Sequence, residues 1–218
     1  LFKRFREAFR GGFGTECGVI GPPDAVAKAV LAHSPLAVAL TILHIEWMTQ
    51  RHYTDSVRDA GDLDPQFKSL LRHHWMEEGL ATYVEPVARA RAGLLSPTIV
   101  WSDLVDGLPK GLPADGDGGL DRTPAWGRTY WGGALFWLLA DVELRGRSAG
   151  RIGLEVALRG IVRQGGTIGR FWTAEEVISA GDEATGQTVL RELYDRLALA
   201  PTSIDLEDLW RRLGVVPG

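Results

Sequence analysis

The sequence predicts an all-α fold, because helical periodicity extends over nearly the whole chain. Apolar residues recur three and four positions apart, as they do on one face of a helix. Val, Ile and Thr do not gather into alternating runs, and no Asn-Gly or Asp-Gly turn joins two such runs. The sequence therefore favours a domain of several packed helices without a β-sheet.

Length and composition set bounds on this domain and its partners. The chain has 218 residues, of which 45% are hydrophobic, so we expect one mostly helical domain over residues 1–218. The segment 107–123, rich in glycine, proline and aspartate, is typical of a mobile loop and is where the domain could divide. The net charge of −4 argues against nucleic acid as a partner. The single cysteine, Cys17, excludes an internal disulfide and a cysteine-based zinc cluster.

The beginning of the chain bears on its location. It starts at Leu1 rather than at Met, so we expect that a preceding segment has been removed. The longest apolar run near this end, residues 36–43, is far too short to span a bilayer. The sequence thus predicts a soluble chain without a transmembrane segment. Export is compatible with it, and its compartment and oligomeric state stay open.

Capping and turn residues set the expected helix bounds. Pro35 lies in a first turn, Thr173 and Glu176 have the spacing of a capping box, and Gly93 ends a helix. Pro86 should kink or split that helix. The expected helices cover residues 1–10, 23–33, 35–53, 64–73, 75–91, 97–106, 124–147, 153–163, 173–179, 184–199 and 204–213. The first of them carries a phenylalanine stripe with basic flanks, which we expect to dock on its own domain rather than on a membrane.

One short segment carries most of the functional information. Residues 75–83 read Trp-Met-Glu-Glu-Gly-Leu-Ala-Thr-Tyr, which places Glu78 near the start of a helix and directly before Gly79. Glu78 suits a metal ligand presented by a helix, whereas the simpler explanation is an acidic residue stabilised by the helix dipole. Gly79 should let a neighbouring helix approach closely. His74 lies four residues before Glu78, so the two share a face if the helix begins early enough.

Three segments of the chain, in order, match the pattern of a known family. The first is Trp-x-x-Glu-Gly at 75–79, followed by Arg-Ala-Arg-Ala-Gly-Leu at 89–94. The second is Tyr-x-x-Gly-Ala at 130–134, and the third is Gly-Leu-Glu-Val-Ala-Leu-Arg at 153–159. Together they resemble the glycyl-aminopeptidase-type (M61-like) gluzincin metallopeptidases and, more loosely, the M1 aminopeptidases. The resemblance covers about residues 35–165 and implies the multi-helix core of a gluzincin-like catalytic domain.

The resemblance also implies roles for particular residues. Glu78 would be the third zinc ligand, and Tyr130 would donate its hydroxyl to the oxyanion of a tetrahedral intermediate. Tyr130 lies among several aromatic residues, so a place in an aromatic core competes with this role. We expect the helices that carry His44, Glu78 and Tyr130 to pack with these side chains facing one cavity.

The chain departs from the family pattern at the first zinc-binding helix. His-Glu-x-x-His, which supplies two zinc ligands and a general base, is absent. His44 can take the place of the first histidine, but Ile45 then stands at the base's position and Met48 at the second histidine's. An isoleucine cannot accept a proton, and a thioether is a poor ligand for Zn²⁺. His74 together with Glu78 is a weaker candidate for a rebuilt site.

These observations leave three hypotheses. The favoured one is a degenerate peptidase-like domain with an incomplete zinc site, which binds a peptide or protein ligand without hydrolysing it. The second is an active zinc peptidase with a rearranged ligand set, Glu78 with His44 or His74, and the third is a non-catalytic helical scaffold. Zinc is the expected cofactor if the site works, and none is expected otherwise. The aspartates of residues 115–119 hint at calcium, but they lack the later ligands of an EF-hand, so a solvated loop is the simpler interpretation.

Overall fold

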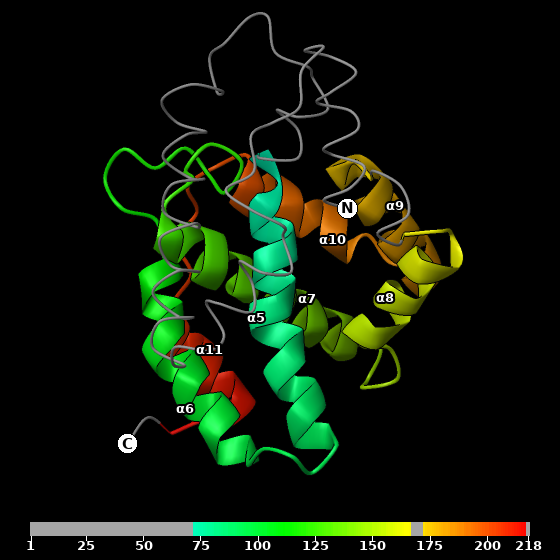
Figure 1. The fold of residues 1–218 in the computed structure, drawn as a ribbon, viewed down its shortest axis with the longest axis horizontal. Coiled ribbons are helices and arrows are strands. Elements are labelled where there is room, and N and C mark those ends of the chain that lie inside the picture. The colour runs from blue at the N-terminus through cyan, green and yellow to red at the C-terminus, as the bar shows by residue number, and fades with distance from the viewer. Residues whose placement is uncertain (1–71, 167–171, 217–218) are drawn as a thin grey trace, which may run out of the picture. The chain divides into compact units, whose positions relative to one another are not determined.

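The computed structural model describes residues 72–166 and 172–216, and the structural statements below concern these residues. They belong to one compact unit, which runs from His52 to Gly218. Their regular structure is helical and no strand occurs among them, which confirms the predicted all-α class (Figure 1). None of the helices in this part of the chain has the length and apolar composition needed to cross a bilayer. The helices predicted nearer the start of the chain lie outside the described residues.

Ten helices and helical turns make up the regular structure of the described residues. In chain order they are α5 (His74–Arg91), α6 (Pro97–Gly107), the 3-10 turn η2 (Leu108–Gly111), the π-helical turn η3 (Arg128–Gly132), α7 (Gly133–Arg147), α8 (Leu154–Arg163), α9 (Ala174–Thr185), α10 (Val189–Leu193), the π-helical turn η4 (Tyr194–Ala198) and α11 (Leu206–Leu213). Helix α7 is buried over most of its length, and α5, α8, α10 and the turns η2 and η3 pack against it.

Local signals in the sequence explain several helix ends. The side chain of Ser96 accepts a hydrogen bond from the Thr98 N–H and caps α6, whose first residue is Pro97. The predicted capping box of Thr173 and Glu176 is formed at the start of α9. These caps satisfy N–H groups that the first turn of a helix leaves without a partner.

Two predicted helix bounds are wrong. The break expected between residues 179 and 184 does not occur, because α9 continues to Thr185 and ends where Gly186 adopts a left-handed φ of 66°. The helix expected from 124 is helical only from Trp126 onward and includes the π-helical η3 before α7 begins. Of the two effects predicted for Pro86, a kink or a split, the split does not occur, because α5 continues as one helix to its predicted end.

Helices α5 and α7 cross through two glycines. A Cβ added to Gly79 of α5 would stand 2.2 Å from the carbonyl carbon of Gly133 in α7. A Cβ on Gly133 would stand 2.3 Å from the carbonyl oxygen of Trp75. A larger residue at either position would force the two backbones apart. The prediction that Gly79 permits a close approach is therefore confirmed, and Figure 1 shows the two helices crossing.

Aromatic side chains fill the core beside this crossing. The rings of Trp75 and Phe136 meet edge to face with centroids 5.1 Å apart, and those of Phe136 and Trp137 do so at 5.0 Å. The Trp137 indole N–H donates a 2.9 Å hydrogen bond to the Met76 carbonyl, so its one polar atom is satisfied in the core. These contacts join α5 to α7 around the glycine crossing.

Buried polar contacts hold the second half of the segment 107–123, whereas Ala114, Asp115 and Gly116 are exposed. The Asp117 side chain is 2% exposed, and its carboxylate lies 2.8 Å from Arg128 Nε. Leu120 and Asp121 donate their backbone N–H groups to carbonyls of η4 at 3.0 and 3.2 Å. A guanidinium thus occupies the place at Asp117 that a calcium ion would need.

Candidate functional site

Two stripes of residues run side by side along α5. Residues four apart on a helix lie one above the other, so each stripe presents one surface. The buried stripe, which we call the packing face, consists of Trp75, Gly79 and Tyr83. The partly exposed stripe, which we call the site face, consists of His74, Glu78, Thr82 and Pro86.

His74 and Glu78 meet on the site face because α5 begins at His74, one residue earlier than predicted. His74 Nε2 lies 3.5 Å from Glu78 Oε1, and the two side chains are 25% and 27% exposed. Thr82, one turn further on, donates its hydroxyl to the Glu78 carbonyl at 2.7 Å. This start also places Glu78 beyond the first turn of α5, where the helix dipole stabilises a carboxylate less.

The π-helical turn η3 brings the second family-like segment against α5. Tyr130 lies in η3, which packs on α5 just before the Gly79–Gly133 crossing. The Tyr130 side chain is partly buried, and its ring lies 5.8 Å from that of Trp126, which is 45% exposed. Glu78 and Tyr130 therefore lie on elements that pack together. The third residue predicted for this cavity, His44, lies outside the described residues.

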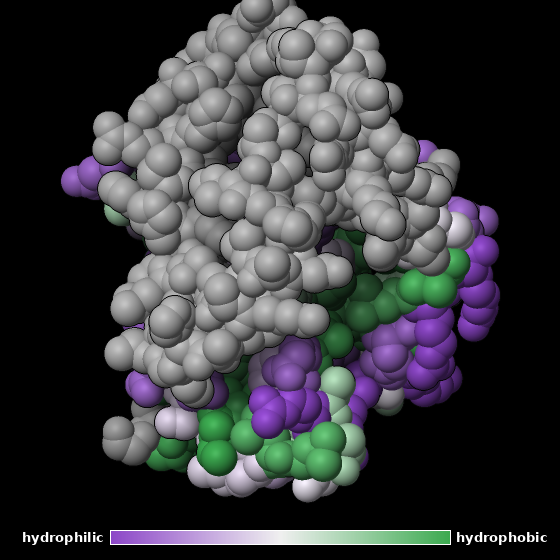
Figure 2. Space-filling model, in the orientation of Figure 1, coloured by the Kyte–Doolittle hydropathy of each residue, from purple (hydrophilic) through white to green (hydrophobic). Residues whose placement is uncertain are grey.

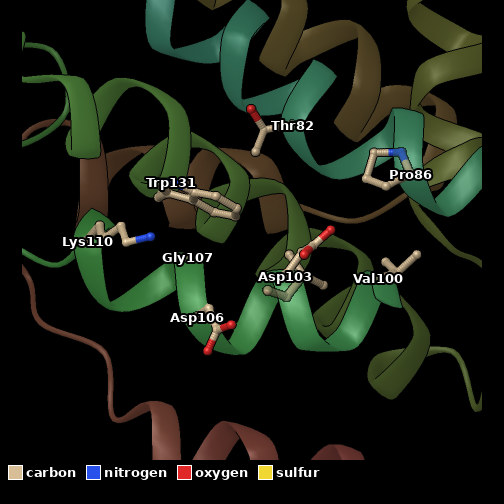
Figure 3. A pocket seen from close by; sticks show the side chains of 9 residues that line it. Thr82, Pro86, Val100, Asp103, Asp106, Gly107, Lys110 and Trp131 are labelled. Carbon is tan, nitrogen blue, oxygen red and sulfur yellow. The ribbon is translucent and has the colours of Figure 1, made fainter. Parts of the chain in front are cut away.

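A pocket opens beside the site face, one helical turn further along α5 than Glu78. It encloses about 280 Å³ and lies between α5, α6 and η3. Its lining residues, shown in Figure 3, are Thr82, Pro86, Val100, Asp103, Leu104, Asp106, Gly107, Lys110 and Trp131. Neither Glu78 nor Tyr130 lines it, but Thr82 follows Glu78 by one turn and Trp131 follows Tyr130 in the chain.

The pocket combines one aromatic wall with charges of both signs. The Trp131 ring lies against Gly107, where an added Cβ would stand 2.2 Å from a ring atom. Lys110 Nζ lies 5.7 Å from the centre of the same ring, within the range of a cation–π contact. Asp103 and Asp106 are exposed on α6, so the lining contains two carboxylates as well as the ammonium group of Lys110. Figure 3 shows the Asp103 carboxylate directed toward α5.

The described residues do not by themselves fit a zinc ion. A catalytic zinc needs three protein ligands and an open position for water. His74 and Glu78 supply two donors from one helix face. Within residues 72–166 and 172–216 no group of three or more His, Cys, Asp or Glu side chains is placed to hold a metal. His44, Ile45 and Met48 lie outside this part of the chain.

A buried carboxylate at the N-terminal end of α5, which we call the Asp121 cluster, joins three elements. Asp121 accepts hydrogen bonds from Trp75 Nε1 at 2.8 Å and from the Tyr194 hydroxyl at 2.5 Å. His73 Nε2 lies 3.5 Å from the same carboxylate. Burial alone would raise the pKa of Asp121, but the bonds from His73, Tyr194 and Trp75 outweigh it and hold this pKa below its ordinary value.

A second buried carboxylate, which we call the Asp141 cluster, lies two turns further along α5. Asp141 accepts hydrogen bonds from the Tyr83 hydroxyl at 3.0 Å, from Arg145 Nε at 2.9 Å and from the Leu154 N–H at 2.8 Å. Arg145 also contacts Glu155 at 2.7 Å, so the cluster contains two carboxylates and one guanidinium. Burial, together with the neighbouring Asp141, raises the pKa of Tyr83.

Sequence reasoning missed both clusters and the pocket. The partners of Asp121 and Asp141 on α5 lie 46 and 58 residues away, so no local spacing connects them. One signal was present for Asp141, because a lone aspartate inside an apolar helical run requires buried donors. The pocket had no such signal, since its lining comes from four elements, α5, α6, η2 and η3, that meet only in the fold.

Comparisons with protein-family models, with curated proteins and with solved structures found no match to this chain.

Proposed function

We propose that this chain is a degenerate zinc-metallopeptidase-like domain that binds a peptide beside Glu78 without hydrolysing it. The observation that supports this most is the contact between the two family-like segments, 75–79 and 130–134. They are far apart in the sequence, yet they pack on one another through Gly79 and Gly133. A site that draws Glu78 from one segment and Tyr130 from the other requires such a contact.

The position of the pocket supports peptide binding. The site face leads from Glu78 to Thr82, and Thr82 lines the pocket. One turn of helix advances about 6 Å, roughly the length of two peptide units in an extended chain. A peptide lying along the site face would therefore reach the pocket with a side chain one or two residues from Glu78.

The absence of hydrolysis follows from what the site would lack. Zinc hydrolysis needs three ligands and a base that takes the proton of the bound water. Under the resemblance, Ile45 stands at the base's position and Met48 at a ligand's. With Glu78 and one histidine as donors, the ion would be held weakly.

The contact between His74 and Glu78 favours one second candidate, an active zinc peptidase with a rearranged ligand set. These two donors lie on one helix face 3.5 Å apart, so they could hold a metal together with a ligand from elsewhere in the chain. Such an enzyme would still need a base to replace the missing glutamate.

Metal content and turnover separate the two candidates. We expect purified protein to contain much less than one zinc per chain and to show no turnover of aminoacyl-p-nitroanilides, with Glu78→Gln indistinguishable from the parent. Zinc-dependent turnover in the parent that disappears in Glu78→Gln would establish the rearranged enzyme instead. Retention of dye-labelled pentapeptides by the zinc-free protein tests the binding itself.

Repair of the missing motif provides an independent test. Replacing Ile45 by Glu and Met48 by His would recreate His-Glu-x-x-His beginning at His44. We expect the double variant to bind Zn²⁺ more tightly than the parent, measured by competition with a chelating dye. Ile45→Glu alone restores the base but no ligand, so its zinc affinity should stay close to that of the parent. Equal affinity of all three proteins would count against the proposed alignment of this helix.

A further inference from the structure

We infer that the pocket between α5, α6 and η3 receives a basic side chain, arginine or lysine, of the bound peptide. This inference rests on the proposed peptide binding and adds the class of residue that the site selects. It is carried by three properties of the pocket: its charge, its aromatic wall and its size.

The charge of the pocket favours a cation. Asp103 and Asp106 contribute two carboxylates and Lys110 one ammonium group, so the lining residues that the structure describes carry a net charge of −1. Within the described residues, no ion pair neutralises Asp103 or Asp106. A guanidinium or ammonium group near Asp103 would be attracted by both carboxylates of α6.

The arrangement of the charges defines an orientation. Lys110 and Asp103 lie to either side of Trp131 in Figure 3, with the indole ring between them. Lys110 already occupies the face of the ring at 5.7 Å and would repel a second cation there. The cationic end of the bound side chain must therefore lie toward Asp103, and that end of the pocket adjoins Thr82 and Pro86 of the site face.

The remaining lining suits the aliphatic part of such a side chain. Pro86, Val100 and Leu104 contribute apolar surface, and Trp131 adds a flat wall. Arginine and lysine bury their methylene groups along apolar surface while the charged end stays near solvent. A volume of about 280 Å³ lies at the lower end of the range for ligand pockets, so it suits one side chain rather than a larger molecule.

The decisive probes are five acetylated, amidated pentapeptides that carry the same dye and differ only at the central residue. The central residue is arginine, lysine, citrulline, norleucine or glutamate, and the other four are alanine. Citrulline keeps the shape of arginine and removes its charge, so the pair isolates the electrostatic contribution. We expect the arginine and lysine peptides to bind the full chain roughly three- to fivefold more tightly than the citrulline peptide, measured by fluorescence anisotropy.

A substitution in the pocket tests the same electrostatic contribution from the side of the protein. Asp103→Asn should abolish the preference for arginine over citrulline and leave the affinity for citrulline unchanged. Asp115→Asn, which removes the same charge from an exposed residue of the loop, should preserve the preference. Raising the salt concentration should weaken binding of the arginine peptide and not that of the citrulline peptide.

The outcomes distinguish this inference from the proposed function. Three results would overturn the preference of the pocket for a basic side chain and leave peptide binding intact. They are equal binding of the arginine and citrulline peptides, equal effects of Asp103→Asn and Asp115→Asn, and tightest binding of the glutamate peptide. If n-propylguanidine alone binds as tightly as the arginine peptide, the pocket takes a free cation and not a peptide side chain. If none of the five peptides binds, both the proposed peptide binding and the preference for a basic side chain are wrong.

Discussion

The two stripes of α5 differ in their burial and in how they are held by the rest of the fold. On the packing face, Trp75 bonds to Asp121, Gly79 lies against Gly133, and Tyr83 bonds to Asp141, so each residue is tied to a distant segment. The site face is partly exposed, and its hydrogen bond from Thr82 to Glu78 stays within the helix.

The difference shows how one helix can combine a rigid support with a binding surface. Buried contacts to Asp121, Gly133 and Asp141 fix the position and rotation of α5 at three successive turns. The neighbouring stripe is then presented in a fixed orientation. Substitutions on the packing face should therefore change stability, whereas those on the site face should change binding.

The largest effect is expected at the glycine crossing. Gly79→Ala places a Cβ 2.2 Å from the Gly133 backbone, which cannot move without displacing α7. We expect the free energy of unfolding to fall by about 3 kcal/mol or more, measured by urea denaturation. Gly146→Ala is the matched control, because Gly146 lies in α7 with open space around its added Cβ. Its free energy of unfolding should rise by about 0.5–1 kcal/mol, because alanine favours a helix more than glycine does. An equal loss of stability in both variants would contradict the close contact between Gly79 and Gly133.

The next effect should come from the Asp121 cluster. Asp121→Ala removes the acceptor for the buried Trp75 indole N–H and for the Tyr194 hydroxyl. Donors buried without a partner lower stability, so we expect a loss of about 2 kcal/mol in urea denaturation. Asp115→Ala, in the exposed part of the same loop, should change stability by less than about 0.5 kcal/mol. A similar small change at Asp121 would show that the cluster does not hold α5.

A smaller, pH-dependent effect follows from the lowered pKa of Asp121. Because this pKa is lower in the folded protein than in the unfolded chain, its contribution is complete above the unfolded pKa and is lost as the pH falls through the folded one. Between about pH 5 and about pH 3 the parent should therefore lose more stability than Asp121→Asn. Urea denaturation at a series of pH values measures both slopes. Parallel slopes would mean that Asp121 does not titrate differently on folding.

The smallest effect on stability is expected on the site face. Glu78→Gln keeps the size of a side chain that is 27% exposed, so the free energy of unfolding should change by less than about 0.5 kcal/mol. The same variant tests metal binding and turnover, because a stable protein isolates the functional change. Thr82→Val serves as a second variant of this face, since it removes one hydroxyl at nearly constant volume. A loss above 1 kcal/mol in Glu78→Gln, roughly twice the usual surface effect, would place Glu78 among the structural residues.

The sequence predicted the helices well and the contacts between them poorly. Periodicity located every described α-helix, and the capping box at Thr173 marked the start of α9, because these signals are local. The buried contacts of Asp117 and Asp121 in the segment 107–123 were not predicted, because their partners lie in other elements. The left-handed Gly186 marked the true end of α9, but glycine alone does not reveal its φ.

In the candidate site, too, features set by local spacing were predictable and those set by tertiary packing were not. Glu78 and its contact with His74 follow from a spacing of four residues, which a helix converts into proximity. The close approach at Gly79 was also predictable, since glycine beside a helix contact permits it. The pocket at Trp131 was not, because residues of α5, α6 and η3 become neighbours only through tertiary packing.

The π-helical turn η3 has a consequence for how this chain can vary in length. A π-helical turn holds one residue more than a turn of α-helix, and its wider winding takes up that residue, so the helix on its two sides keeps nearly the same phase. Deleting one residue from 128–132 would therefore close η3 to regular winding with little rotation of Trp126 relative to Gly133. Deleting one residue from a regular turn of α7 would instead rotate the residues on its two sides by about 100° relative to one another. We therefore expect a change of chain length to be tolerated better at this turn than within α7.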